Sequence, residues 1–261
     1  MTDYLIDTHA HLDFAELYDR LEEVLDNAMN NNVKRIISIS TNLNKIDKII
    51  DLSDKNKNIF FTVGTHPNEV LKDKNNSNYD LIQNLSKKNK CVGIGECGLD
   101  YHYGKDSIRE QKISFITQIN VARDTGLPLV IHSRDADQDM INILTSEFKN
   151  GPFQAILHCF SSGKKLALCG LDLGFYISFS GIVTFKSAKE IQEIAMLVPD
   201  DKILVETDSP YLSPTTLRGS INEPKNCYLT AKFLSDIRKG DFNEFISQLF
   251  INSKKIFDKL Y

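Results

Sequence analysis

The sequence has no Cys-x-x-Cys pair, no long apolar run and no linker rich in Pro, Gly or Ser. Its five cysteines, at positions 91, 97, 159, 169 and 227, are an odd number. This pattern favours free thiols in a reducing compartment over a disulfide framework. No window approaches the ~18 apolar residues of a membrane span, and the start "MTDYLIDTHAH" lacks the charged and apolar regions of a signal peptide. We therefore expect a soluble cytoplasmic protein with no membrane association.

Basic residues are also not in excess, since 31 Lys and Arg stand against 35 Asp and Glu, for a formal net charge of −4. This balance excludes a protein whose main role is to coat nucleic acid through a basic surface. It does not exclude an enzyme that acts on phosphodiesters, because bound divalent cations would add positive charge that the count omits.

The length of 261 residues fits two small domains or one large barrel. Because no linker divides the chain, we expect one domain over residues 1–261. Short apolar runs alternate with longer segments of helical period. The eight predicted strands are Tyr4–Asp7, Arg35–Ser40, Ile59–Gly64, Cys91–Gly95, Leu129–His132, Ala155–His158, Tyr176–Phe179 and Ile203–Glu206.

A helical segment follows each of the first seven strands, and two more helical segments come after the eighth strand. The predicted helices are Glu16–Asn31, Lys45–Lys55, Tyr79–Lys88, Ile108–Thr125, Asp137–Phe148, Lys164–Asp172, Ala188–Leu197, Leu229–Lys239 and Phe242–Leu260. Strict alternation of strand and helix calls for parallel strands covered by helices, and eight units predict a single-domain α/β fold, the (β/α)8 TIM barrel. A doubly wound open sheet is the alternative, but no glycine-rich phosphate turn follows the first strand.

Five of the six histidines stand at the carboxyl ends of predicted strands, where the active sites of such barrels lie. The pattern begins with "IDTHAHLD", in which His9 and His11 alone are weak evidence for a metal site. The strand ends that carry a histidine or a carboxylate read "DTHAH", "VGTHP", "GIGECGLD", "VIHSRDA", "ILHCFSSG" and "LVETDSP". Their spacing, 26 to 36 residues for one strand–helix unit and 50 or 55 for two, supports a ring of polar groups around one barrel mouth.

Neutral imidazole and carboxylate groups are suited to Zn, Mn, Fe or Mg. Six candidate ligands exceed the four of one tetrahedral site, and Glu96 lies in the middle of the series. We therefore predict two divalent metal ions (Mg, Mn or Zn), bridged by Glu96, and no organic cofactor. One ion is held by His9, His11, Glu96 and Asp208, and the other by Glu96, His132 and His158.

These motifs resemble the signature blocks of the TatD-type metal-dependent DNases, members of the amidohydrolase superfamily. The blocks occur in order from about residue 6 to about residue 224, where "RGSINEP" is similar to the family segment Arg-Gly-x-x-Asn-Glu-Pro. The resemblance maps the family's ligands onto the same six residues. It implies a Mg- or Mn-dependent 3′ to 5′ DNA exonuclease (a deoxyribonuclease) that prefers single-stranded ends.

Two carboxylates and a histidine are the predicted catalytic residues: Asp208, which accepts the proton of the attacking water, Glu96 and His66. His66 matches an additional active-site histidine of the family, cast as a phosphate contact or proton-transfer group. Arg134 is predicted to bind a phosphate oxygen. In the loop after the fourth strand, Tyr101, His102 and Tyr103 are candidates to stack on an unpaired base, with simple loop packing as the alternative.

Two other functions stay open on the sequence. The first keeps the metals but acts on a small ester or amide, or on an aminoacyl-tRNA ester, since the fold does not dictate the substrate. The second is a non-enzymatic barrel with structural metals, although structural zinc sites are usually closed and rich in cysteine. DNA with single-stranded or frayed ends is the predicted substrate and partner.

Overall fold

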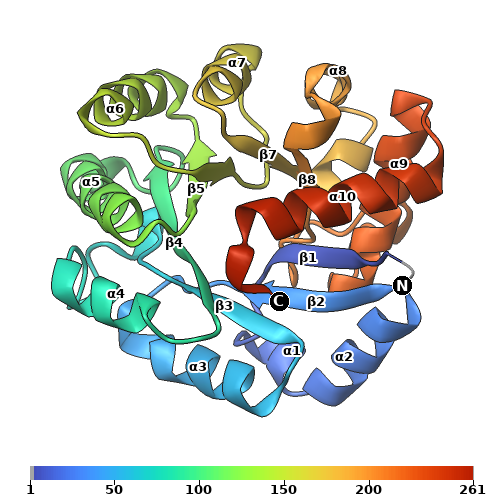
Figure 1. Ribbon diagram of the computed structural model, residues 1–261, viewed down its shortest axis with the longest axis horizontal. Coiled ribbons are helices and arrows are strands. Elements are labelled where there is room, and N and C mark those ends of the chain that lie inside the picture. Colours follow the sequence, from blue (N-terminus) through green and yellow to red (C-terminus); the bar gives the residue numbers. More distant parts are fainter. Residues whose placement is uncertain (1–2, 261) are drawn as a thin grey trace.

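Eight parallel strands, each hydrogen-bonded to the next along the chain, form the centre of the computed structural model, which describes residues 3–260 (Figure 1). The strands are β1 (Leu5–Ala10), β2 (Val33–Ser38), β3 (Ile59–Val63), β4 (Cys91–Asp100), β5 (Leu129–Arg134), β6 (Ala155–Leu157), β7 (Tyr176–Phe179) and β8 (Ile203–Val205). The order β1 to β8 and the helices between the strands are those of a nearly closed (β/α)8 barrel. The predicted fold class is therefore confirmed.

The seam between β8 and β1 closes at the carboxyl ends of the strands. There the Asp208 N–H donates to the His9 carbonyl at 2.9 Å, and the His11 N–H donates to the Ser209 carbonyl at 2.8 Å. The Thr8 hydroxyl also donates to the Val205 carbonyl. These bonds exclude the open doubly wound sheet, and they tie two of the predicted ligand segments to each other.

Helices surround the strands, as Figure 1 shows. They are α1 (Ala15–Tyr18), α2 (Leu21–Asn30), α3 (Ile46–Lys55), α4 (Tyr79–Ser86), α5 (Ile108–Thr125), α6 (Asp137–Asn150), α7 (Lys164–Asp172), α8 (Lys189–Leu197), α9 (Cys227–Arg238) and α10 (Phe242–Ile256). Within residues 3–260, no helix is both long enough and apolar enough to cross a membrane.

Two hydrophobic cores hold the fold together. The larger one lies between the strands and the helices. The smaller one takes apolar side chains from all eight strands and is completed by Ile256, Phe257 and Leu260 after the last strand. Burial of apolar surface stabilises the folded state by roughly 25 cal/mol per Å². These cores therefore fix the strands in place, and the polar side chains at the carboxyl ends of the strands are held on a rigid frame.

The predicted bounds of most elements differ from the observed ones by one to three residues, and three differences are larger. The segment Glu16–Asn31 is two helices, because the Arg20 Nε donates to the Glu16 carbonyl while the Arg20 N–H bonds to the Leu17 carbonyl instead. Helix α10 ends at Ile256, and a short 3-10 turn follows it at Asp258–Leu260. Strand β4 continues to Asp100 although glycines make its second half a poor strand former, because that half pairs with β5.

Candidate metal centre

Glu96 lies at the centre of the barrel mouth, and its two carboxylate oxygens face different groups of histidines. Oε2 is 3.3 Å from the Nε2 of His9 and 3.9 Å from the Nε2 of His11. Asp208 completes this first group, since its Oδ1 is 3.3 Å from the His11 Nε2 and 3.7 Å from the His9 Nε2. Four donor atoms, from β1 and the residue just after it, from β4 and from the loop after β8, thus surround one small volume.

The second group gathers at Oε1 of Glu96. The Nε2 of His158 is 2.7 Å from this oxygen, the Nδ1 of His132 is 3.0 Å from it, and the Nε2 of His66 is 3.3 Å from it. The structure therefore brings together all six predicted ligands and His66, and it offers two donor sets that share Glu96. These two donor sets contain the same residues as the two sets predicted from the sequence.

Three of the rings are oriented by contacts on their far side. The Nε2 of His132 lies 3.2 Å from the Asp100 carboxylate, so that its Nδ1 is left to face Glu96. His66 is arranged differently, because its Nδ1 accepts the Asn68 N–H at 3.0 Å and its proton is then on Nε2. His66 therefore presents a hydrogen-bond donor to the site, whereas His132 presents a lone pair.

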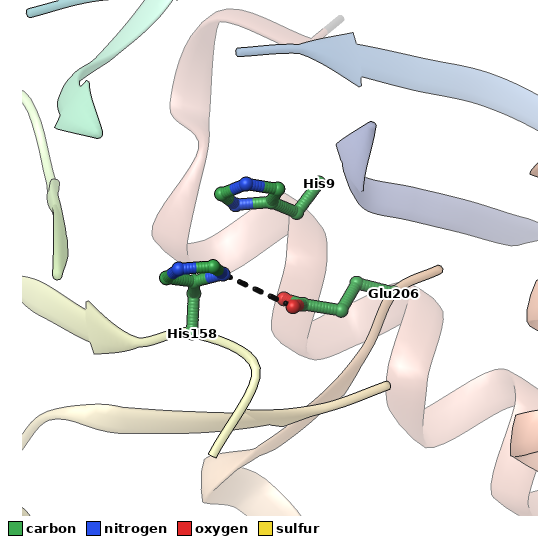
Figure 2. Close-up of side chains that lie close together, drawn as sticks. All are labelled: His9, His158 and Glu206. Atoms are coloured by element: carbon green, nitrogen blue, oxygen red, sulfur yellow. Dashed lines mark hydrogen bonds and ion pairs between the residues drawn. The ribbon is translucent and has the colours of Figure 1, made fainter. Parts of the chain in front are cut away.

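His9 and His158 stack with ring centroids 3.8 Å apart and planes within 7°, and Glu206 lies beside both (Figure 2). The Glu206 Oε1 is 3.2 Å from the His158 Nδ1, and it also accepts the Cys159 N–H at 2.8 Å. Glu206 thus contacts a histidine of the second donor set. With Nδ1 of His158 held by this carboxylate, Nε2 is directed to Glu96.

The polar atoms of this site fit divalent cations. Both ring nitrogens of His9 and the Nδ1 of His11 are buried without a hydrogen-bond partner, although such atoms are almost always satisfied in proteins. Burial lowers the pKa of His9, so its imidazole is neutral and its nitrogen is available as a ligand. Groups of histidines and carboxylates whose ligand atoms lie within 4.8 Å of one another include His9, His11 and Glu96.

Glu96 is ionised although it is buried. Burial alone would raise its pKa, but the interactions with the surrounding histidines, with His158 first among them, hold that pKa well below its usual value. For His158 burial acts in the other direction, and the carboxylates of Glu96 and Glu206 on its two sides raise its pKa well above the usual value. A buried anion among imidazoles is the electrostatic setting in which a cation can replace protons.

Asp7 holds the loop that carries Asp208. Its carboxylate accepts the Thr207 N–H at 2.9 Å and the Thr207 hydroxyl at 2.5 Å. Burial raises the pKa of Asp7 to about 8, in spite of these bonds. Asp208 follows Thr207 directly with φ of 56°, a conformation that is uncommon outside glycine.

The predicted substrate-binding residues have different surroundings. Arg134 is exposed at the end of β5, and its guanidinium lies 4.7 Å from the ring centroid of Tyr103. His102 is also exposed and pairs with Asp135 at 3.0 Å. Tyr101 is packed against the larger core, and its hydroxyl donates to Asp139 at 2.7 Å. The structure therefore favours loop packing for Tyr101, and it brings Tyr103 to the surface in its place.

Sequence reasoning gave no role to Asp100, which lies at the end of β4. Its Oδ2 contacts the His132 Nε2 and accepts the Asn68 side-chain amide at 2.9 Å, while Oδ1 accepts the Tyr103 N–H at 2.8 Å. One signal was available: Asp100 stands four positions beyond Glu96, and alternate residues of a strand share a face. Asp100 thereby links the orientation of His132 to that of the following loop.

Comparisons with known proteins agree with this geometry. The family model described as "TatD related DNase" matches residues 6–258. The uncharacterized metal-dependent hydrolase YabD of Bacillus subtilis is 37% identical over 254 residues, covering 97% of this chain and 98% of that protein. The uncharacterized metal-dependent hydrolase YcfH of Escherichia coli K12 is also 37% identical, over 251 residues, covering 94% of this chain and 92% of that protein.

A solved structure shows the same fold. The crystal structure of YjjV, a TatD homologue from Escherichia coli K12, superposes with a TM-score of 0.91 at 24% identity and covers 99% of both chains. A TatD-family hydrolase from Entamoeba histolytica superposes with a TM-score of 0.85 at 24% identity, covering 98% of this chain and 99% of that one. From the family match and these relatives, the chain belongs to the TatD-related DNase family of metal-dependent hydrolases.

Proposed function

We propose that this hydrolase cleaves phosphodiester bonds and releases nucleotides from the 3′ ends of single-stranded or frayed DNA. One observation carries the proposal: two sets of donor atoms lie on the two oxygens of one buried carboxylate, Glu96. A pair of cations in such an arrangement lowers the pKa of a water molecule and neutralises the attacking and leaving oxygens of a displaced phosphate. The family description, DNase, supports the same substrate class.

The ligands in this proposal are the residues predicted for two divalent ions, Mg, Mn or Zn. His9, His11 and Asp208 would hold one ion together with Glu96, and His132 and His158 would hold the other, also with Glu96. Nitrogen and oxygen donors at a barrel mouth, with one side open to solvent, are typical of catalytic rather than structural metal sites.

The chain's own residues supply the remaining steps. The Asp208 carboxylate, which is 15% exposed, accepts the proton of the attacking water. His66 donates from Nε2 to a phosphate oxygen of the substrate, because its Nδ1 is occupied by the Asn68 N–H. Arg134, exposed at the end of β5, adds positive charge against the phosphate. We place the reaction in the cytoplasm, a proposal supported by the five free cysteines.

A substrate panel tests the reaction class. Purified protein is given bis(p-nitrophenyl) phosphate, p-nitrophenyl acetate, a lactone and an aminoacyl-tRNA, each with Mg, Mn or Zn and with a chelator control. We expect metal-dependent hydrolysis of the phosphodiester to exceed that of the carboxylic esters. Preference for a carboxylic ester or for the aminoacyl-tRNA would overturn the proposal in favour of that substrate class.

A further inference from the structure

Two aromatic side chains stand at the β8–β1 side of the barrel mouth, each tied to a proposed metal ligand. The Phe14 N–H donates to the His11 carbonyl at 3.2 Å, and the Tyr211 N–H donates to the Asp208 carbonyl at 3.0 Å. The Phe14 ring stacks on His11 with centroids 4.9 Å apart, and Tyr211 meets Phe14 edge-on at 6.0 Å. Tyr211 is 52% exposed, so this seam pair presents an aromatic face to solvent beside one donor set.

A second aromatic face stands at the end of β4 and β5. Tyr103 is 70% exposed, and the Arg134 guanidinium covers its ring at 4.7 Å. Its N–H donates to Asp100, whose other oxygen contacts His132. This Tyr103–Arg134 pair is thus connected to the second donor set in the way that the seam pair is connected to the first.

The two pairs lie on opposite sides of the metal centre. In a barrel with strand order β1 to β8, the β8–β1 seam is half a turn away from the β4–β5 pair, and Glu96 projects between them. An open hollow of about 500 Å³ adjoins Phe14, and its other lining residues are polar, with two carboxylates and two amines: Asp13, Asn44, Lys45, Asp47 and Lys48. Its volume is within the roughly 300–1,000 Å³ typical of small-ligand sites.

From this arrangement, we propose that the two aromatic pairs bind the nucleobases on the two sides of the scissile phosphate. The seam pair of Phe14 and Tyr211 stacks on one base, with the hollow beside Phe14 receiving that nucleoside. The Tyr103–Arg134 pair stacks on the other. This inference rests on the proposed function, because it takes a single-stranded polynucleotide as the substrate that crosses the mouth.

The chemistry of the two faces suits an unpaired strand rather than a duplex. Bases in a duplex are stacked on each other, whereas an unpaired base exposes a face to an aromatic ring or an arginine plane. Stacking is tolerant of base identity, and each stacked base contributes about 1–3 kcal/mol. An enzyme that trims ends of any sequence needs this kind of contact more than hydrogen bonds to base edges.

The test combines protein variants with substrates that lack a base. The variants are Tyr211→Leu and Tyr103→Leu, and the control is Ile251→Ala, which changes a residue that is 53% exposed on α10, outside the mouth. Each protein is assayed on a single-stranded hexanucleotide that is intact, that lacks the base of the 3′-terminal nucleotide, or that lacks the base of the penultimate one. The rate at which the terminal nucleotide is released gives separate values of KM and kcat.

On the intact strand, each tyrosine variant is expected to raise KM about 5-fold to 150-fold, the range that corresponds to one lost stacking contact, while Ile251→Ala matches the wild type. One variant no longer has a higher KM than the wild type when the terminal base is absent. The other no longer has a higher KM than the wild type when the penultimate base is absent. A rise in KM that persists on both base-free strands, or no rise in KM on the intact strand, would overturn the inference and leave the nuclease function standing. Failure of the wild type to act on any of the three strands would overturn both proposals.

Discussion

His66 and His132 approach the same oxygen of Glu96 at 3.3 Å and 3.0 Å, yet their other ring nitrogens have opposite partners. The Nδ1 of His66 accepts a backbone N–H, whereas the Nε2 of His132 faces the Asp100 carboxylate. Since a neutral imidazole carries one proton, the first ring donates toward the site and the second offers a lone pair. The two histidines lie at similar distances from Glu96 but have different hydrogen-bonding roles, which the distances alone do not separate.

Replacing His66 by Ala is expected to leave two metal ions per chain and to lower kcat about 100-fold to 1,000-fold, the range for loss of one preorganised donor. Replacing His132 by Ala is expected to remove one of the two ions. The measurement is metal content by mass spectrometry after dialysis, together with kcat on an oligonucleotide. Loss of an ion from the His66 variant would make that histidine a ligand and contradict its role as a donor.

Glu206 acts on the site through the ring of His158. Glu206→Gln keeps the size of the side chain but removes the charge that fixes the Nδ1 proton of that ring, so we expect metal affinity to fall about 10-fold to 100-fold. Titration calorimetry with Mn or Zn gives the affinity. The matched control is Glu147→Gln, whose carboxylate pairs with Arg123 outside the mouth. Equal affinities for the two variants would show that Glu206 has no part in orienting the ligands.

At this scale the sequence predicted which side chains meet at the barrel mouth, because histidine is rare in the chain and parallel strands bring their carboxyl ends together. It did not predict that Asp100 orients His132, since this depends on a contact between β4 and β5. It also did not separate the packed Tyr101 from the exposed Tyr103, because the direction of each side chain is set by the turn after β4.

Among the elements, the loop between β8 and α9 carries Asp208 and is held by the buried side chain of Asn222 in addition to that of Asp7. The Asn222 amide donates to the carbonyls of Thr207 and Tyr211, at 2.9 Å and 2.7 Å, and these residues lie on either side of Asp208. The Asn222 Oδ1 accepts the Asn226 amide at 2.8 Å. This loop has no regular secondary structure around Asp208, so its shape depends on such bonds.

Asn222→Ala leaves several of these groups without partners. We expect the free energy of unfolding to fall by about 2–4 kcal/mol, since each orphaned buried polar group costs roughly 1–3 kcal/mol, and kcat to fall because Asp208 is no longer fixed. Urea denaturation and kinetics check this. Ser220→Ala is the control, because that hydroxyl is exposed and bonds only within the same loop. If both variants unfold at the same urea concentration, Asn222 does not hold the loop.

The elements themselves were predictable where the signal is local. Strand β7 and the helices α5 and α7 have the predicted bounds, since their apolar runs and helical periods are uninterrupted. The break between α1 and α2 was missed because no glycine or proline marks it. It follows from the Arg20 side chain, which also reaches Glu223 far along the chain at 2.5 Å.

In the molecule as a whole, metal binding and stability are coupled through the buried carboxylate and histidines of the barrel mouth. A cation that binds only the folded chain adds about 2.7 kcal/mol when its concentration is 100 times its Kd. For a chain of this size we expect a chelator to lower Tm by roughly 5 to 10 °C per ion lost. Differential scanning calorimetry with Mn and with chelator measures the change. Identical transitions would contradict metal binding at the mouth.

The fold places stability and chemistry at opposite ends of the barrel. Apolar side chains fill its interior together with Phe257 and Leu260, while the charged groups gather at the carboxyl ends. Alternation of strands and helices was enough to predict this layout, because a parallel barrel has one open face for its loops. The substrate was not predictable to the same degree, since it depends on side chains that the loops present.

The most direct test of the account follows the length of a 5′-labelled single-stranded oligonucleotide incubated with the protein and Mn. The account predicts progressive shortening from the 3′ end, abolished by a chelator and reduced at least 1,000-fold by Glu96→Gln, which replaces the carboxylate shared by the two donor sets. An intact oligonucleotide, or equal shortening by the wild type and by Glu96→Gln, would contradict it.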